Sequence, residues 1–137
     1  MSLFDGSRIV EVLRYQGSGP MPAGTVLTVR LVVNGQPMMA LNGGPAFSFN
    51  PAVSMVVECD NQAEVDSLWA RLCEGGSPSQ CGWPTDRYGL SWQVVSTAML
   101  DMLRSSDSAA ANRAMAAMMT MVKLDIATLQ AAFDGRH

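Results

Sequence analysis

Polar side chains that could bind a small molecule alternate with apolar ones in two strand-like stretches of this sequence. Ser91 and Gln93 occupy alternate positions in one stretch, and Ser54 and Glu58 lie on one side of the other. Because successive strand residues project to opposite faces, each pair faces away from an apolar set. Hydroxyl and amide groups can orient a carbonyl or hydroxyl of a ligand. We therefore expect a ligand-binding strand face, and the alternative is that these residues only face water.

Three further side chains extend this set. Arg30 lies on the polar side of a strand-like segment, where it can pair with an anionic ligand or with Glu58. Cys81 and Trp83 belong to the motif QCGW, and their thiol and indole are candidates for nucleophilic attack and aromatic stacking, although the sequence offers Cys81 no neighbouring histidine as a base. The candidate ligand-binding residues are Arg30, Ser54, Glu58, Cys81, Trp83, Ser91 and Gln93.

Composition excludes several classes of function. The net charge is −3 with a single lysine, so no basic stripe is available for phosphates and we expect no nucleic-acid partner. No apolar run is long enough to cross a bilayer and the N-terminus has no signal-peptide core, so we expect a cytoplasmic protein without a membrane partner. Three cysteines without CxxC spacing and one histidine, the terminal His137, argue against a disulfide framework, a metal site or a cofactor bound through them.

The first third of the chain predicts an antiparallel meander. Alternation marks strands over 8–15 and 25–33, with Leu27, Val29, Leu31 and Val33 on one face of the second. Asn34-Gly35 is the signal for a type I′ hairpin turn, and residues 36–42 form the returning strand. Pro and Gly then break the pattern as far as Pro51.

The remainder predicts a strand, a helix, a hairpin and three C-terminal helices. The strand covers 52–59, and Asn61 with Glu64 forms a capping box for a helix that Gly75 closes. Residues 79–95 are expected to form a hairpin that turns at 86–89. The three helices cover 97–103, 107–122 and 125–135. The methionine stripe of the second helix is expected to pack against the protein's own sheet or a sister subunit, or to line a ligand groove.

Several motifs resemble the PhnB-like branch of the vicinal oxygen chelate superfamily, whose members often carry the name 3-demethylubiquinone-9 3-methyltransferase-like domain. They are NGGP (42–45), VECDNQAEVDSLWARLCEGG (57–76), QCGW (80–83), DRYGLSWQVV (86–95) and KLDIATLQAA (123–132). The resemblance implies an α+β fold of the glyoxalase/bleomycin resistance type: a cupped, antiparallel-rich sheet of two βαβββ modules, in a homodimer with small-molecule or metal sites in the cup. Residues 3–9 look like the family's join into its second strand, so the first module is truncated.

We accordingly predict a single domain, with a truncated first module (1–45), a second module (46–96) and C-terminal helices (97–137). The first hypothesis for function is a metal-free, small-molecule-binding homodimer. The alternatives are a metal-dependent lyase or dioxygenase-type enzyme with a site shared between subunits, and a catalytically silent, shortened paralogue. A methyltransferase is not expected, because Gly43-Gly44 is followed by Pro45 and not by a helix that could hold a methyl donor.

Overall fold

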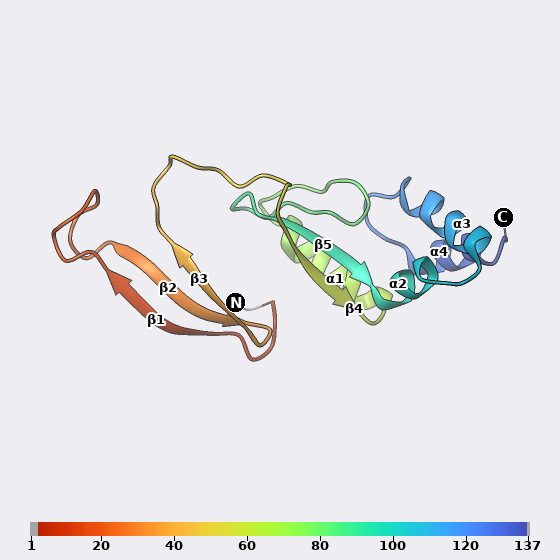
Figure 1. Cartoon of the computed structure of the whole chain (residues 1–137), viewed down its shortest axis with the longest axis horizontal. Coiled ribbons are helices and arrows are strands. Elements are labelled where there is room, and N and C mark those ends of the chain that lie inside the picture. The colour runs from red at the N-terminus through yellow and green to blue at the C-terminus, as the bar shows by residue number, and fades with distance from the viewer. Residues whose placement is uncertain (1–2, 137) are drawn as a thin grey trace. The chain divides into compact units, whose positions relative to one another are not determined.

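The computed structural model describes residues 3–136, which form two compact units that divide between Ser48 and Phe49 (Figure 1). Unit 1 contains three strands and unit 2 contains two strands and four helices. This boundary lies three residues after the predicted end of the first module. His137, the one histidine of the sequence, lies outside the described residues.

Unit 1 is the predicted antiparallel meander. Strands β1 (Arg8–Arg14), β2 (Val26–Val33) and β3 (Gln36–Leu41) lie in the order β1-β2-β3. Both residues of the turn between β2 and β3 have positive φ, 47° at Asn34 and 80° at Gly35, as a type I′ turn requires. The hairpin prediction is confirmed, because this turn depends only on two adjacent residue types.

Unit 1 has no hydrophobic core of its own. Within the described residues 3–48, every side chain is at least partly exposed, including the apolar residues of the central strand β2. Large apolar side chains of the outer strands are well exposed, such as Ile9 at 58% and Leu41 at 67%. Burial of apolar side chains is the main favourable term in folding, so unit 1 taken by itself gains little stability from burial.

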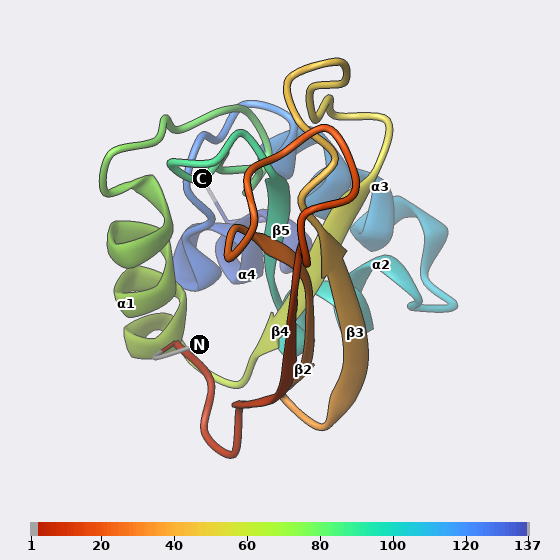
Figure 2. The same ribbon diagram turned by 90° about the vertical axis from the view of Figure 1, so that its left-hand side faces the viewer.

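Unit 2 begins with a strand–helix–strand unit. Strand β4 (Ser54–Cys59), helix α1 (Gln62–Cys73) and strand β5 (Ser91–Ser96) follow one another, and β4 pairs with β5 in parallel. Figure 2 shows α1 alongside this pair. Parallel neighbours need such a crossover connection. The parallel pairing was not anticipated by the predicted hairpin, which placed β5 in an antiparallel ribbon.

The predicted hairpin over 79–95 is only partly formed. Residues 82–84 do run antiparallel to β5, since Trp92 N donates to Pro84 O at 2.9 Å and Val94 N donates to Gly82 O at 2.8 Å. The first arm is not a regular strand, because Cys81 and Gly82 both have positive φ (58° and 79°). The prediction of a regular two-strand ribbon is therefore wrong over its first half, whereas the turn at 86–89 is correct.

Helix α1 is bounded as its end residues predict. Asn61 is the N-cap, and its side chain accepts a hydrogen bond from Glu64 N at 3.0 Å. In turn, the Glu64 carboxylate accepts a hydrogen bond from the backbone nitrogen of Asp60 at 2.8 Å. In a standard capping box the donor would be the N-cap residue itself, and Asp60 lies one residue before it. Gly75, with φ 74°, follows the helix as the left-handed residue that ends it.

The C-terminal helices enclose the main core of unit 2. Helices α2 (Thr97–Leu103), α3 (Ser108–Met118) and α4 (Ile126–Phe133) begin after the side-chain caps Ser96, Asp107 and Asp125. Helix α3 stops four residues before the predicted Val122. The buried residues at the centre are Val95, Met99, Met102, Ala114, Leu124 and Leu129.

No helix in the described part of the chain is long and apolar enough to span a membrane.

Candidate functional site

The β4–β5 pair gathers four of the predicted site residues on one face. The register pairs Ser54 with Ser91, Val56 with Gln93 and Glu58 with Val95, and paired residues project to the same side. We call this surface the Ser54–Gln93 face; it consists of Ser54, Val56, Glu58, Ser91, Gln93 and Val95. The alternate face carries Cys59 and Val94, both fully buried. The register thus brings Ser54, Glu58, Ser91 and Gln93 onto one face of this strand pair.

A hydrogen bond between strands fixes the polar groups of this face. The Gln93 amide nitrogen donates to the Ser54 hydroxyl oxygen at 2.8 Å. The Ser54 hydroxyl keeps its proton as a donor, and the Gln93 carbonyl is an acceptor. Ser91 is 3% exposed, whereas Val56 is 56% exposed. The face thus presents a donor and an acceptor next to an open apolar side chain, and Val95 at its other end is part of the helical core.

Glu58 gives the Ser54–Gln93 face its only charge. The Glu58 side chain is exposed near the C-terminal end of β4. None of the six residues of the face is a cation. Glu58 is four residues along β4 from Ser54, roughly 13 Å at about 3.3 Å per strand residue, so its charge is largely screened at the Ser54–Gln93 hydrogen bond. The face itself offers an anionic ligand no cation to pair with.

Arg30 belongs to unit 1 and has a different partner from the one considered in the sequence. Its guanidinium lies 3.9 Å from the Glu11 carboxylate on the neighbouring strand β1. Both side chains are more than half exposed, so the pair contributes little to stability. Glu58 belongs to unit 2, so the alternative pairing of Arg30 with Glu58 stays a prediction.

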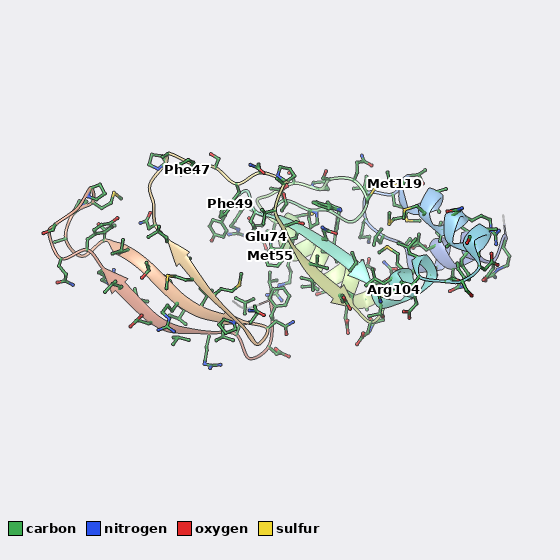
Figure 3. The ribbon with its side chains drawn as sticks, in the orientation of Figure 1. Phe47, Phe49, Met55, Glu74, Arg104 and Met119 are labelled. Carbon is green, nitrogen blue, oxygen red and sulfur yellow. The ribbon has the colours of Figure 1, made fainter. Side chains whose placement is uncertain are left out.

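Cys81 is directed to the segment that follows α3. Its backbone N donates to Met121 O at 2.8 Å, and Gly82 N donates to Val122 O at 2.7 Å. Its sulfur lies 3.8 Å from the Met119 sulfur, and Figure 3 labels Met119. These contacts give Cys81 a role in joining two parts of unit 2. Trp83, two residues on, is half-buried and likewise does not belong to the Ser54–Gln93 face.

The other two cysteines are less available for chemistry. Burial, with smaller contributions from the carboxylates of Glu64 and Asp60, raises the pKa of the Cys59 thiol to about 11. Burial also raises the pKa of the Cys73 thiol. Since the thiolate is the reactive form, both residues are predicted to be poor nucleophiles at neutral pH.

Asp86 organises the approach to β5 and was identified from the sequence only as a turn residue. One carboxylate oxygen accepts from Tyr88 N at 2.9 Å and Leu90 N at 3.1 Å. The other accepts from the Trp92 indole nitrogen at 2.9 Å. The signal for the first two bonds is the Asp-x-x-Gly turn pattern, whereas the indole bond depends on how the strand folds back. Asp86 therefore holds β5 and its Ser54–Gln93 face in position.

The family resemblance implies a metal site, and the donors present do not fit one. Within residues 3–136, no three His, Cys, Asp or Glu side chains come together. The Ser54–Gln93 face offers one carboxylate, an amide and two hydroxyls, a set poor in the imidazole and thiolate ligands that transition metals favour. No reaction step through a metal is derived for this surface.

The fold and the site define a small α+β protein with an antiparallel sheet, a helix-connected strand pair and a polar strand face. The family model for 3-demethylubiquinone-9 3-methyltransferase matches residues 1–95, and the chain belongs to this PhnB-like family. The coarser vicinal oxygen chelate superfamily is consistent with that assignment. No curated protein matches the chain.

Solved structures agree with the family and the fold. A putative 3-demethylubiquinone-9 3-methyltransferase, a PhnB protein from Bacillus cereus, is 34% identical over 70% of this chain and 84% of its own, with a TM-score of 0.63. Protein PA1353 from Pseudomonas aeruginosa is 28% identical over 66% of this chain and 79% of its own, with a TM-score of 0.52. The predicted fold class is confirmed by these similarities.

Proposed function

We propose that the protein is a metal-free, small-molecule-binding homodimer that takes a neutral polar ligand on the Ser54–Gln93 face. The observation that carries the proposal is the 2.8 Å bond from Gln93 to Ser54, which leaves a hydroxyl donor and an amide acceptor side by side. A ligand with a carbonyl next to a hydroxyl can accept from Ser54 and donate to Gln93, while its carbon skeleton contacts Val56.

The ligand's class follows from charge. No cation lies on the Ser54–Gln93 face to pair with a carboxylate or phosphate, so a small neutral hydroxycarbonyl compound fits better than an organic acid. We do not propose methyl transfer: among the described residues, Gly43 and Gly44 lie in the irregular segment after β3, which no helix follows before β4. The protein is proposed to act in the cytoplasm.

Thermal unfolding with added ligand tests this proposal. We expect dihydroxyacetone to raise the unfolding temperature, because at about ten times the dissociation constant a ligand stabilises the folded state by about 1.4 kcal/mol. Pyruvate should have a smaller effect. Gln93→Ala should abolish the dihydroxyacetone effect and Gln36→Ala, a matched change on β3, should leave it intact. Equal stabilisation of both variants would show that the ligand binds elsewhere.

The same samples distinguish the alternatives. A metal-dependent lyase or dioxygenase-type enzyme, completed by a second subunit, would retain a transition metal near one per chain in elemental analysis. A catalytically silent paralogue would show neither metal nor stabilisation by hydroxycarbonyl compounds. Metal-free protein with a Gln93-dependent rise in unfolding temperature is the outcome that the proposal expects.

A further inference from the structure

An open cleft of about 640 Å³ lies between α3 and α4 of unit 2 (Figure 1). Small-molecule pockets occupy about 300–1,000 Å³, so the cleft is large enough for a compact ligand. Both helices follow residue 95, where the match to the family model ends. The cleft therefore belongs to a part of the chain that the family match does not describe.

The floor of the cleft is apolar and consists of alanines. Ala116 comes from α3, and Ala127, Ala131 and Ala132 come from α4. Ala127 and Ala131 are four residues apart, so they are neighbours on one side of the helix. Methyl groups fill little of the space between two helices, and a larger side chain in place of Ala116 would close it. The floor can thus accept a flat or compact apolar group.

Two arginines line the end of the cleft at the C-terminus of α4. Arg113 reaches across from α3, where its Nε donates to Ala132 O at 3.0 Å and its Nη2 donates to Phe133 O at 2.6 Å. Arg136 follows α4, and its Nη2 donates to the Asp134 carboxylate at 2.7 Å. A guanidinium has five N–H donors, so these bonds orient both groups and leave each of them further donors for a ligand.

The charge at this end of the cleft is positive. Hydrogen bonds from Gln130 and Arg136 lower the pKa of the Asp134 carboxyl below its usual 3.8, so this group is ionised at neutral pH. One carboxylate therefore stands against two guanidiniums, and the carbonyl oxygens that end α4 offset about half a further charge. The remaining charge suits a monoanion better than a dianion. At the opposite end of α4 the N-cap is Asp125, which gives that end no excess of positive charge.

We propose that the cleft between α3 and α4 binds a monocarboxylate with a compact apolar body, such as an aromatic acid. The carboxylate accepts hydrogen bonds from Arg113 and Arg136, since a planar guanidinium matches the geometry of a carboxylate. The apolar body covers Ala116 and Ala131, which removes apolar surface from water. This site shares no residue with the Ser54–Gln93 face, and its ligand differs in charge from the neutral compound proposed there.

NMR titration of ¹⁵N-labelled protein with benzoate tests the site. Benzoate carries both features, benzamide has the same ring without a charge, and acetate has the charge without a ring. We expect benzoate to bind with a dissociation constant of about 1 mM or lower, at least about 10-fold below those of benzamide and acetate. The shifts should include the backbone amides of Arg113, Ala116 and Ala131. Equal dissociation constants for benzoate and benzamide would overturn the proposal, as would shifts confined to other elements.

A matched pair of arginine substitutions tests the role of charge. Arg136→Gln should raise the benzoate dissociation constant at least about 10-fold, because it removes one of the two guanidiniums. Its exposed pair with Asp134 contributes little to stability, so the helices should remain folded. Arg104→Gln changes an exposed arginine after α2 that is not part of the cleft (Figure 3). That control should leave the constant unchanged, and equal effects of the two substitutions would contradict the proposal.

A second pair of substitutions tests the floor without changing any charge. Ala116→Leu should raise the benzoate dissociation constant at least about 10-fold, because the larger side chain occupies the cleft. Ala70→Leu, at an exposed alanine of α1, is the matched control and should have no effect. Gln93→Ala should also leave benzoate binding unchanged, since the two sites are separate. Benzoate binding that persists in both Arg136→Gln and Ala116→Leu would remove this site, whatever the result with dihydroxyacetone.

Discussion

Replacing Asp86 with alanine is expected to lower the free energy of unfolding of the protein by about 3 kcal/mol. The substitution removes three hydrogen bonds at one carboxylate, from Tyr88 N, Leu90 N and the Trp92 indole. A buried hydrogen bond to a charged group contributes about 1.5–3 kcal/mol to stability. Because the turn is half-exposed, each of these three bonds is expected to contribute less, about 1 kcal/mol. For a cooperative unit of this size the unfolding temperature should fall by roughly 15 °C.

Urea unfolding followed by tryptophan fluorescence measures this loss, and Arg87→Ala is the matched control. Arg87 lies in the same turn, and its pair with Glu74 is 3.6 Å long with both side chains exposed. Such a pair contributes at most about 1 kcal/mol. A double-mutant cycle with Trp92→Phe should give a coupling energy near 1 kcal/mol for the indole bond. A loss below about 1 kcal/mol for Asp86→Ala would refute the assignment of Asp86 as the residue that organises this turn.

Three other predictions concern stability and reactivity. Leu129→Ala, at a fully buried side chain, should lower the free energy of unfolding by about 2–5 kcal/mol in urea titrations. The hydrogen bond from Lys123 lowers the pKa of the Asp66 carboxyl below its usual 3.8, so this pair stabilises the folded protein above that pH and ceases to do so as the pH falls further. Asp66→Asn should therefore flatten the stability profile between pH 4 and the acid transition, and an unchanged profile would contradict the pairing. Iodoacetamide at pH 8 should alkylate Cys81 faster than Cys59, whose thiol has a pKa of about 11, and mass spectrometry of quenched samples gives the order.

Local signals accounted for the elements that were predicted correctly. Asn61 and Gly75 bound α1 because capping and a left-handed C-terminal residue depend on a few neighbouring positions. Asn34-Gly35 sets its turn for the same reason. The alternation of polar and apolar residues placed Ser54 and Gln93 each on the polar face of its strand, but it does not show which strands pair. The hydrogen bond between the two side chains follows from the β4–β5 register.

Long-range contacts explain what the sequence did not predict. In the first arm of the expected hairpin, the backbone nitrogens of Cys81 and Gly82 donate to the carbonyl oxygens of residues 121 and 122. No local pattern in the sequence indicates this partner. The partner of Arg30 depends on an irregularity in β1 between Ile9 and Glu11, which shifts the register by one residue. The bond from Trp92 to Asp86 likewise requires the chain to fold back over six residues.

The segment between β3 and β4 contains the boundary between the two units and carries exposed apolar side chains. Figure 3 labels Phe47 and Phe49, which are 93% and 64% exposed. Exposed apolar side chains and a unit 1 without a core of its own favour an assembly in which apolar surface is removed from water. This agrees with the proposed dimer and predicts a concentration-dependent unfolding temperature.

The side-chain amide resonances of Gln93 test the central claim most directly, because they report on the group proposed to hold the ligand. In a titration of ¹⁵N-labelled protein with dihydroxyacetone, we expect these resonances to shift and saturate, while those of Gln36 stay in place. Gln93 resonances that do not move at saturating ligand, or shifts confined to other parts of the chain, would contradict binding on the Ser54–Gln93 face.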